Sequence, residues 1–119
     1  MQSVAQKESF NSVTVFWLDT DLVLERIRAA VSRLAPDPHV LRVVLFGSFA
    51  EGRAVPGSDV DIMIALETDD RPFPDRIAAH PTCFSDLGIG VDLFPYTVSE
   101  MENPLARRAS DTGIVLFSR

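Results

Sequence analysis

The chain is poor in cysteine and in positive charge. Its only cysteine, Cys83, excludes an internal disulfide, and Lys7 is its only lysine. Its 11 basic residues are outnumbered by 17 acidic ones, so the formal net charge is −6. Proteins that hold long nucleic acids usually carry a basic patch, so extended nucleic acid is not an expected ligand. A single nucleotide is compatible with this charge, because divalent cations can supply the missing positive charge.

Long apolar runs are also missing. No run approaches membrane-spanning length, and the apolar run at 13–18 is too short for a signal peptide, so we expect a cytoplasmic protein without membrane segments. The 119 residues correspond to one domain, and the hydrophobic fraction of 46% suffices for a packed core. We expect residues 1–11 to be a flexible polar segment and residues 12–119 to form the single domain.

Helix-like and strand-like patterns alternate along the chain. Apolar residues at spacings of three and four predict a helix over about 20–35. The Asn103-Pro104 pair predicts the start of a second helix that ends near Asp111 before Gly113, and a short helix is expected within 72–80. Strands are expected at 40–46, 59–66, 89–94 and 114–117, and 13–18 is an edge strand or an anchoring segment. This order predicts an α/β (α+β) fold with a small mixed β-sheet and helices packed on it.

Two aromatic residues in the run at 13–18 have two possible environments. Phe16 and Trp17 lie close to the polar N-terminal segment. Aromatic side chains of this size are usually found in a core, but a position beside a chain end also suits an interface. The sequence favours a core position for both residues and leaves an interface as the alternative.

Three aspartates combine into a candidate metal site. Asp59 and Asp61 are two positions apart at the start of a predicted strand, so alternation places both carboxylates on one face. Asp92 lies between apolar residues of the next predicted strand, and pairing of the two strands would bring its carboxylate within roughly 5 Å. Taken singly, these residues suit a strand cap or a satisfied core acid. Together they predict a site for two Mg²⁺ ions, which offset the repulsion between carboxylates.

Gly47-Ser48 is placed where a predicted strand ends in a tight turn. Glycine allows close approach of the backbone to a phosphate, and the serine hydroxyl and following N–H groups can donate to phosphate oxygens. A glycine-serine pair after a strand is also common in turns without a ligand. The pair therefore gains a functional interpretation only together with the aspartates.

The combined motif resembles that of a known superfamily. Gly47-Ser48, ten further residues and then Asp59-Val60-Asp61 resemble the signature of DNA polymerase β-like nucleotidyltransferases, and residues 45–62 resemble the minimal nucleotidyltransferase (MNT) branch. The resemblance extends through Asp92 to the closing 113–117 segment. It implies a palm-like nucleotidyltransferase fold.

The resemblance also implies roles for the site residues. Asp59, Asp61 and Asp92 would be the catalytic, metal-binding residues, and Gly47 and Ser48 would contact the triphosphate of ATP. Many relatives carry a basic residue where this chain has Glu51, and Arg53 would supply that charge here; its other interpretation is a solvated surface arginine. Ser58 completes the predicted nucleotide contacts.

The function implied is transfer of a nucleotide monophosphate, AMP from ATP, to a hydroxyl acceptor. The MNT resemblance suggests a tyrosine of a helical HEPN-type toxin as acceptor and partner. Because the chain is short, either such a partner or a second copy in a homo-oligomer would complete the site. The alternatives are an antitoxin that acts mainly by binding and a small-molecule nucleotidyltransferase of the aminoglycoside type.

Overall fold

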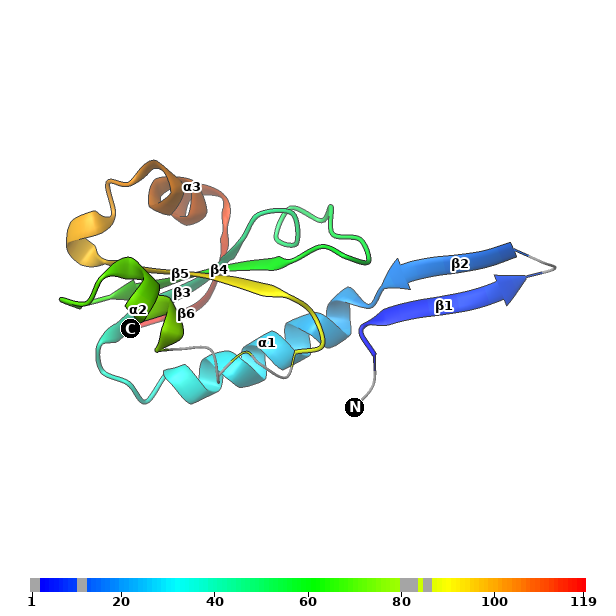
Figure 1. Ribbon diagram of the computed structural model, residues 1–119, viewed down its shortest axis with the longest axis horizontal. Coiled ribbons are helices and arrows are strands. Elements are labelled where there is room, and N and C mark those ends of the chain that lie inside the picture. The colour runs from blue at the N-terminus through cyan, green and yellow to red at the C-terminus, as the bar shows by residue number, and fades with distance from the viewer. Residues whose placement is uncertain (1–2, 11–12, 80–83, 85–86) are drawn as a thin grey trace.

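A four-stranded sheet between helices and a separate two-stranded hairpin make up the computed structural model, which describes residues 3–10, 13–79, 84 and 87–119 (Figure 1). In chain order the elements are β1 (Ala5–Phe10), β2 (Val13–Leu18), α1 (Thr20–Leu34), β3 (Val40–Phe46), β4 (Val60–Leu66), α2 (Phe73–Ala78), β5 (Val91–Thr97), the short 3-10 helix η2 (Val98–Glu100), α3 (Pro104–Thr112) and β6 (Ile114–Ser118). None of the helices in the described residues combines the length and apolar character needed to cross a membrane.

The larger sheet is mixed, as the sequence predicts. Its strand order is β5-β4-β3-β6, with β3 antiparallel to β4 and β6, and β4 parallel to β5. Strand β5 begins two residues later than predicted and continues through Pro95 to Thr97. Proline, which has no N–H to donate, is tolerated here because β5 is an edge strand.

Helix α1 covers one face of this sheet. It begins at the N-cap Asp19, whose carboxylate accepts a hydrogen bond from the Leu22 N–H at 3.1 Å, and it matches the predicted helix. The predicted periodicity becomes its buried face, which packs on buried residues of β3 and β4. The members of α1 in this core are Val23, Ile27, Ala30, Val31 and Leu34.

Helix α3 covers part of the opposite face. Asn103 caps it by accepting a hydrogen bond from the Leu105 N–H at 2.9 Å, and Pro104 occupies its first position, as predicted. Its buried residues Ala106 and Ala109 share a second core cluster with Val44, Phe46 and Met63. This helix has only nine residues, so it leaves one end of this face of the sheet uncovered.

The N-terminal hairpin lies apart from the larger sheet. Strands β1 and β2 pair regularly from Ala5 opposite Leu18 to Phe10 opposite Val13, and Figure 1 shows the hairpin extending away from the helices. The overall extents of 56 × 28 × 24 Å reflect this projection. Strand β2 fits the predicted 13–18 strand, whereas the sequence did not predict β1, because its polar residues have no apolar alternation. Strand pairing with β2 supplies the backbone hydrogen bonds that order it.

Candidate functional site

Two aspartates lie side by side in the centre of the candidate site. Asp61 of β4 is in direct register with Asp92 of β5 in the parallel pair, so the strand pairing on which the candidate site depended is present. Neighbouring strands are about 4.8 Å apart, and residues in register point to the same face. Asp61 is half-buried and Asp92 is exposed. The two carboxylates are therefore open to a ligand from the face on which α3 packs.

The charges of the site act on Asp61. Burial, and then the nearby carboxylates of Asp92 and Asp59, raise the pKa of Asp61 above its ordinary value. Burial acts by disfavouring the charged form, and like charges act in the same direction. The neighbouring carboxylates of Asp92 and Asp59 make the surroundings of Asp61 negative, and a bound cation would relieve this repulsion.

Asp59 joins the site through a glycine that the sequence did not identify. A Cβ added to Gly90 would lie 2.2 Å from Oδ1 of Asp59, so glycine leaves room for this carboxylate in its present position. The Val60 N–H donates to the Gly90 carbonyl at 2.8 Å, which joins the starts of β4 and β5. The only sequence signal for this role was a glycine two residues before Asp92.

The Gly47-Ser48 turn touches the central carboxylate. Gly47 has a φ of +77°, and a Cβ at this position would lie 2.3 Å from Oδ2 of Asp61. The Glu51 N–H donates to the Gly47 carbonyl at 3.1 Å, and the Arg53 N–H donates to the Ser48 carbonyl at 2.8 Å. The tight turn predicted at the end of this strand is therefore present, and its Gly47 lies directly against Asp61.

Two further predicted contacts take part in the structure of the loop itself. The Arg53 guanidinium pairs with the Glu51 carboxylate at 2.8 Å on the surface. The Ser58 hydroxyl accepts a hydrogen bond from the Val55 N–H at 3.0 Å, which holds the turn before Asp59. Both residues lie in the loop between the glycine-serine turn and the aspartates, and their contacts with a nucleotide stay predictions.

The donor set fits a divalent cation by its chemistry. Hard cations such as Mg²⁺ prefer carboxylate oxygens, and the carboxylates of Asp92 and Asp59 act electrostatically on that of Asp61. Across the described ranges, no three His, Cys, Asp or Glu side chains are grouped as a ready-made metal site. Carboxylates repel one another without a cation between them, so side-chain rotation would be needed to direct all three at one ion.

A cavity of about 500 Å³ opens beside Asp92. Its wall is formed by helix α2, the 91–94 segment of β5 and two further apolar residues. Apart from Asp92, the described lining is apolar: Phe73, Ile77, Phe84, Ile89, Val91, Leu93 and Phe94. A largely apolar group that carries one polar end could bind here with that end next to the Asp92 carboxylate.

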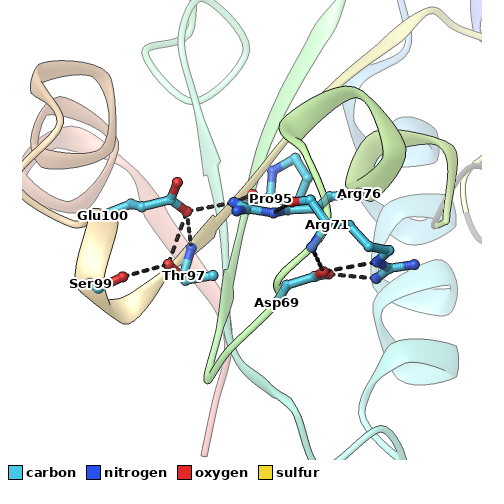
Figure 2. Close-up of polar contacts among 7 residues, drawn as sticks. All are labelled: Asp69, Arg71, Arg76, Pro95, Thr97, Ser99 and Glu100. Atoms are coloured by element: carbon cyan, nitrogen blue, oxygen red, sulfur yellow. Dashed lines mark hydrogen bonds and ion pairs between the residues drawn. The ribbon is translucent and has the colours of Figure 1, made fainter.

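Helix α2 is held against β5 by a buried arginine that the sequence analysis missed. Arg76 is only 8% exposed, and Figure 2 shows its guanidinium between the chain at Arg71 and the carboxylate of Glu100. It donates to the Arg71 carbonyl at 2.8 Å and pairs with Glu100 at 2.5 Å. Glu100 also accepts a hydrogen bond from the Thr97 N–H at 2.9 Å. This hydrogen bond is the main cause that lowers the pKa of Glu100, and the hydrogen bond from Arg76 lowers it further. The network fixes the helix that forms one wall of the cavity.

Comparison with known proteins agrees with the sequence motif. Residues 24–116 match the family described as "Nucleotidyltransferase domain". A solved structure from Sulfolobus solfataricus, assigned provisionally as a nucleotidyltransferase, is 20% identical, has a TM-score of 0.66 and is matched over 84% of each chain. A toxin-antitoxin structure with AMP-PNP is 20% identical with a TM-score of 0.51, and the match covers 86% of this chain and 75% of that one. No curated protein matches the chain. The two solved structures share its fold.

Proposed function

The chain belongs to the nucleotidyltransferase domain family, and from this membership we propose that it transfers AMP from ATP to a hydroxyl group of an acceptor. The observation that carries the proposal is the direct register of Asp61 with Asp92, next to the turn at Gly47. In transfer of phosphoryl-type groups, positioning and neutralisation of charge provide most of the catalysis. The three aspartates and the turn offer both.

Each residue has a role in this reaction. Asp59, Asp61 and Asp92 would hold Mg²⁺, which neutralises the phosphates when bound. The Ser48 hydroxyl and the backbone of its turn hold the triphosphate. Asp92 accepts the proton of the acceptor hydroxyl, whose oxygen forms a bond to the α-phosphorus of ATP. The bond from that phosphorus to the oxygen bridging to the β-phosphate breaks, and pyrophosphate leaves with the electron pair.

The cavity beside Asp92 favours an aromatic acceptor. Its apolar lining suits a ring whose hydroxyl reaches the carboxylate, as the side chain of a tyrosine does. We propose a tyrosine of a helical HEPN-type partner as this acceptor. The similar fold of a toxin-antitoxin structure with AMP-PNP supports both a protein partner and ATP as the nucleotide. An aminoglycoside carries many hydroxyl and ammonium groups, for which the described lining offers only one charged residue.

Radiolabelled ATP provides the test. The chain, Mg²⁺, α-labelled ATP and a co-expressed helical partner are expected to give a labelled partner, and chelation of Mg²⁺ should remove the signal. Asp61→Asn and Asp92→Asn should lose labelling, whereas Asp70→Asn, in an exposed loop, should retain it. Equal labelling by Asp61→Asn would overturn the proposal.

The alternative function is an antitoxin that acts by binding alone, which the toxin-antitoxin neighbour also suggests. The two functions differ in their dependence on the carboxylates. If binding suffices, Asp61→Asn will still neutralise the partner in cells and co-purify with it. If transfer is required, the variant will co-purify but will not neutralise.

A further inference from the structure

The β1–β2 hairpin lies outside the part of the chain that matches the family. The family match begins at residue 24, after the hairpin has ended. In Figure 1 the two strands run outward from the start of α1 and do not lie on the larger sheet. Contact with the domain is at the base, where Val4 is buried and the Asp19 N–H donates to the Val4 carbonyl at 2.7 Å. A two-stranded hairpin alone is marginally stable in water, so a third strand would stabilise it.

The outer edge of β2 is well suited to accept that strand. In the part of the chain that the structure describes, the small sheet contains only β1 and β2, so the edge has no pairing strand. The sequence of β2, Val-Thr-Val-Phe-Trp-Leu, contains no charge, proline or glycine, and its register with β1 has no bulge. Exposed edges are usually protected by such features. The edge of β1, in contrast, carries Lys7 and Glu8.

Symmetry decides which edge can pair with itself. When a two-fold axis relates two antiparallel strands, residues that lie opposite each other must point to the same face of the sheet. The axis must therefore lie where one residue is opposite its own copy. An axis near the middle of β1 would place Lys7 opposite Lys7, or Glu8 opposite Glu8, in the second copy. An axis at Val15 of β2 places Thr14 opposite Phe16 and brings no charges together. Of the two edges, only that of β2 can therefore pair with itself about a two-fold axis without placing like charges opposite each other.

The base of the hairpin limits the register further. Leu18 packs against the core of the domain, and the next residue, Asp19, is bonded to Val4 and caps α1. An axis closer to Leu18 would bring the two domains closer together. An axis at Val15 keeps the pairing on the projecting part of the strand.

We propose that the chain forms a two-fold homodimer in which the β2 edges pair around Val15, giving a four-stranded antiparallel sheet in the order β1-β2-β2-β1. Each hairpin supplies the strand that the other lacks. The dimer does not depend on nucleotide transfer, so its test is independent of catalytic activity.

Paired substitutions at positions 14 and 16 test the register. In Thr14→Glu/Phe16→Glu, the glutamate at position 14 of one copy faces the glutamate at position 16 of the other. In the control Thr14→Lys/Phe16→Glu, the same positions bring lysine opposite glutamate. Within one hairpin, position 16 lies opposite Lys7 and position 14 opposite Ser9 in both variants, so both hairpins keep a favourable glutamate–lysine pair. The variants differ only in the sign of the charge at position 14.

Sedimentation equilibrium of the full chain gives the oligomeric state, with circular dichroism to verify folding. We expect the wild type and the Thr14→Lys/Phe16→Glu control to be dimers, and the double-glutamate variant to dissociate at least about tenfold more readily than the control, since like charges directly opposite are destabilising. A monomeric wild type, or equal dimerisation of the two variants, would overturn the proposal.

Lys7 provides a second measurement because it is the only lysine. In the proposed sheet, the two Lys7 residues are separated by three strand spacings, roughly 14 Å, plus a small offset along the strands. A bifunctional amine reagent of that reach should join Lys7 of isotope-labelled chains to Lys7 of unlabelled chains in a mixed sample. The mixed-isotope Lys7–Lys7 peptide should disappear in the double-glutamate variant, and its persistence there would contradict the proposal.

Discussion

Replacing Gly47 by alanine should disturb the carboxylate of Asp61 more than it disturbs the fold. The new Cβ would lie 2.3 Å from Oδ2 of Asp61, about 1 Å closer than an ordinary carbon–oxygen contact of about 3.3 Å. Because the turn is held by its own backbone hydrogen bonds, the more mobile Asp61 side chain is the part that moves. A displacement of about 1 Å at a reacting centre can reduce the rate by about 10²-fold.

Gly52 is a matched control for this substitution. Its φ of +74° is nearly the same as the +77° of Gly47, but a Cβ there would meet no atom within 4 Å. Alanine in the left-handed region costs about 1 kcal/mol or slightly more at either position. Gly52→Ala should therefore show this backbone cost alone, and Gly47→Ala should show the same cost plus the displacement of Asp61.

The assay combines thermal unfolding with AMP transfer. Both variants should unfold at a temperature about 3–6 °C lower than the wild type, as expected for a loss of about 1 kcal/mol. Transfer should fall about 10²-fold in Gly47→Ala, which corresponds to about 2.7 kcal/mol, and less than about threefold in Gly52→Ala. Equal rates for the two variants would refute the argument that Gly47 positions Asp61 by close contact.

Three other substitutions, one of them with a control, test the electrostatics and the packing. Burial and neighbouring carboxylates raise the pKa of Asp61, so ionisation of Asp61 lowers the stability of the fold as the pH rises above about 4. Asp61→Asn should therefore raise the melting temperature at pH 7 in metal-free buffer. This gain should vanish near pH 3, where Asp61 is protonated in both the folded and the unfolded chain. Arg76→Ala should lower the free energy of unfolding in urea by about 2–4 kcal/mol because Glu100 loses its partner, whereas Arg107→Ala, at an exposed ion pair, should change it by less than about 0.5 kcal/mol. Gly113→Ala should cost about 1–3 kcal/mol by the same urea measurement, because its Cβ would lie 2.5 Å from a helix carbonyl.

Local patterns in the sequence predicted most of the larger sheet and its helices. The apolar spacing of α1 and the Asn103-Pro104 start of α3 depend on residues within one element, and both are confirmed. The glycine-serine turn and the Asp59-Val60-Asp61 motif likewise lie close together in the sequence. The register of β4 with β5 is not a local property, and it is this register that brings Asp92 directly opposite Asp61.

The features that the sequence analysis missed depend on distant contacts. The polar β1 strand is ordered by its pairing with β2, not by a pattern of its own. Arg76 is buried because Glu100, far along the chain, supplies the opposite charge. Nothing in the residues around Arg76 distinguishes it from a surface arginine.

Gly113 ends α3, as predicted, but not through the backbone conformation usual for such glycines. A glycine just after a helix often adopts a positive φ. Its φ is −84°, which any residue can adopt. The space is the actual constraint, because a Cβ would lie 2.4 Å from Cγ1 of Val44 and 2.8 Å from the Leu45 carbonyl.

The length of α3 explains why the aspartates are accessible. Nine helical residues span about 14 Å, whereas the seven residues of β4 span about 23 Å, so α3 cannot cover the whole face of the sheet. The covered part ends at Phe46 and Phe94, whose rings lie 5.4 Å apart and belong to the α3 cluster. Phe46 is opposite Asp61, and Phe94 is two residues after Asp92 on the same face. This aromatic pair therefore separates the closed core from the carboxylates. A longer α3 would bury the aspartates and close the site to a ligand.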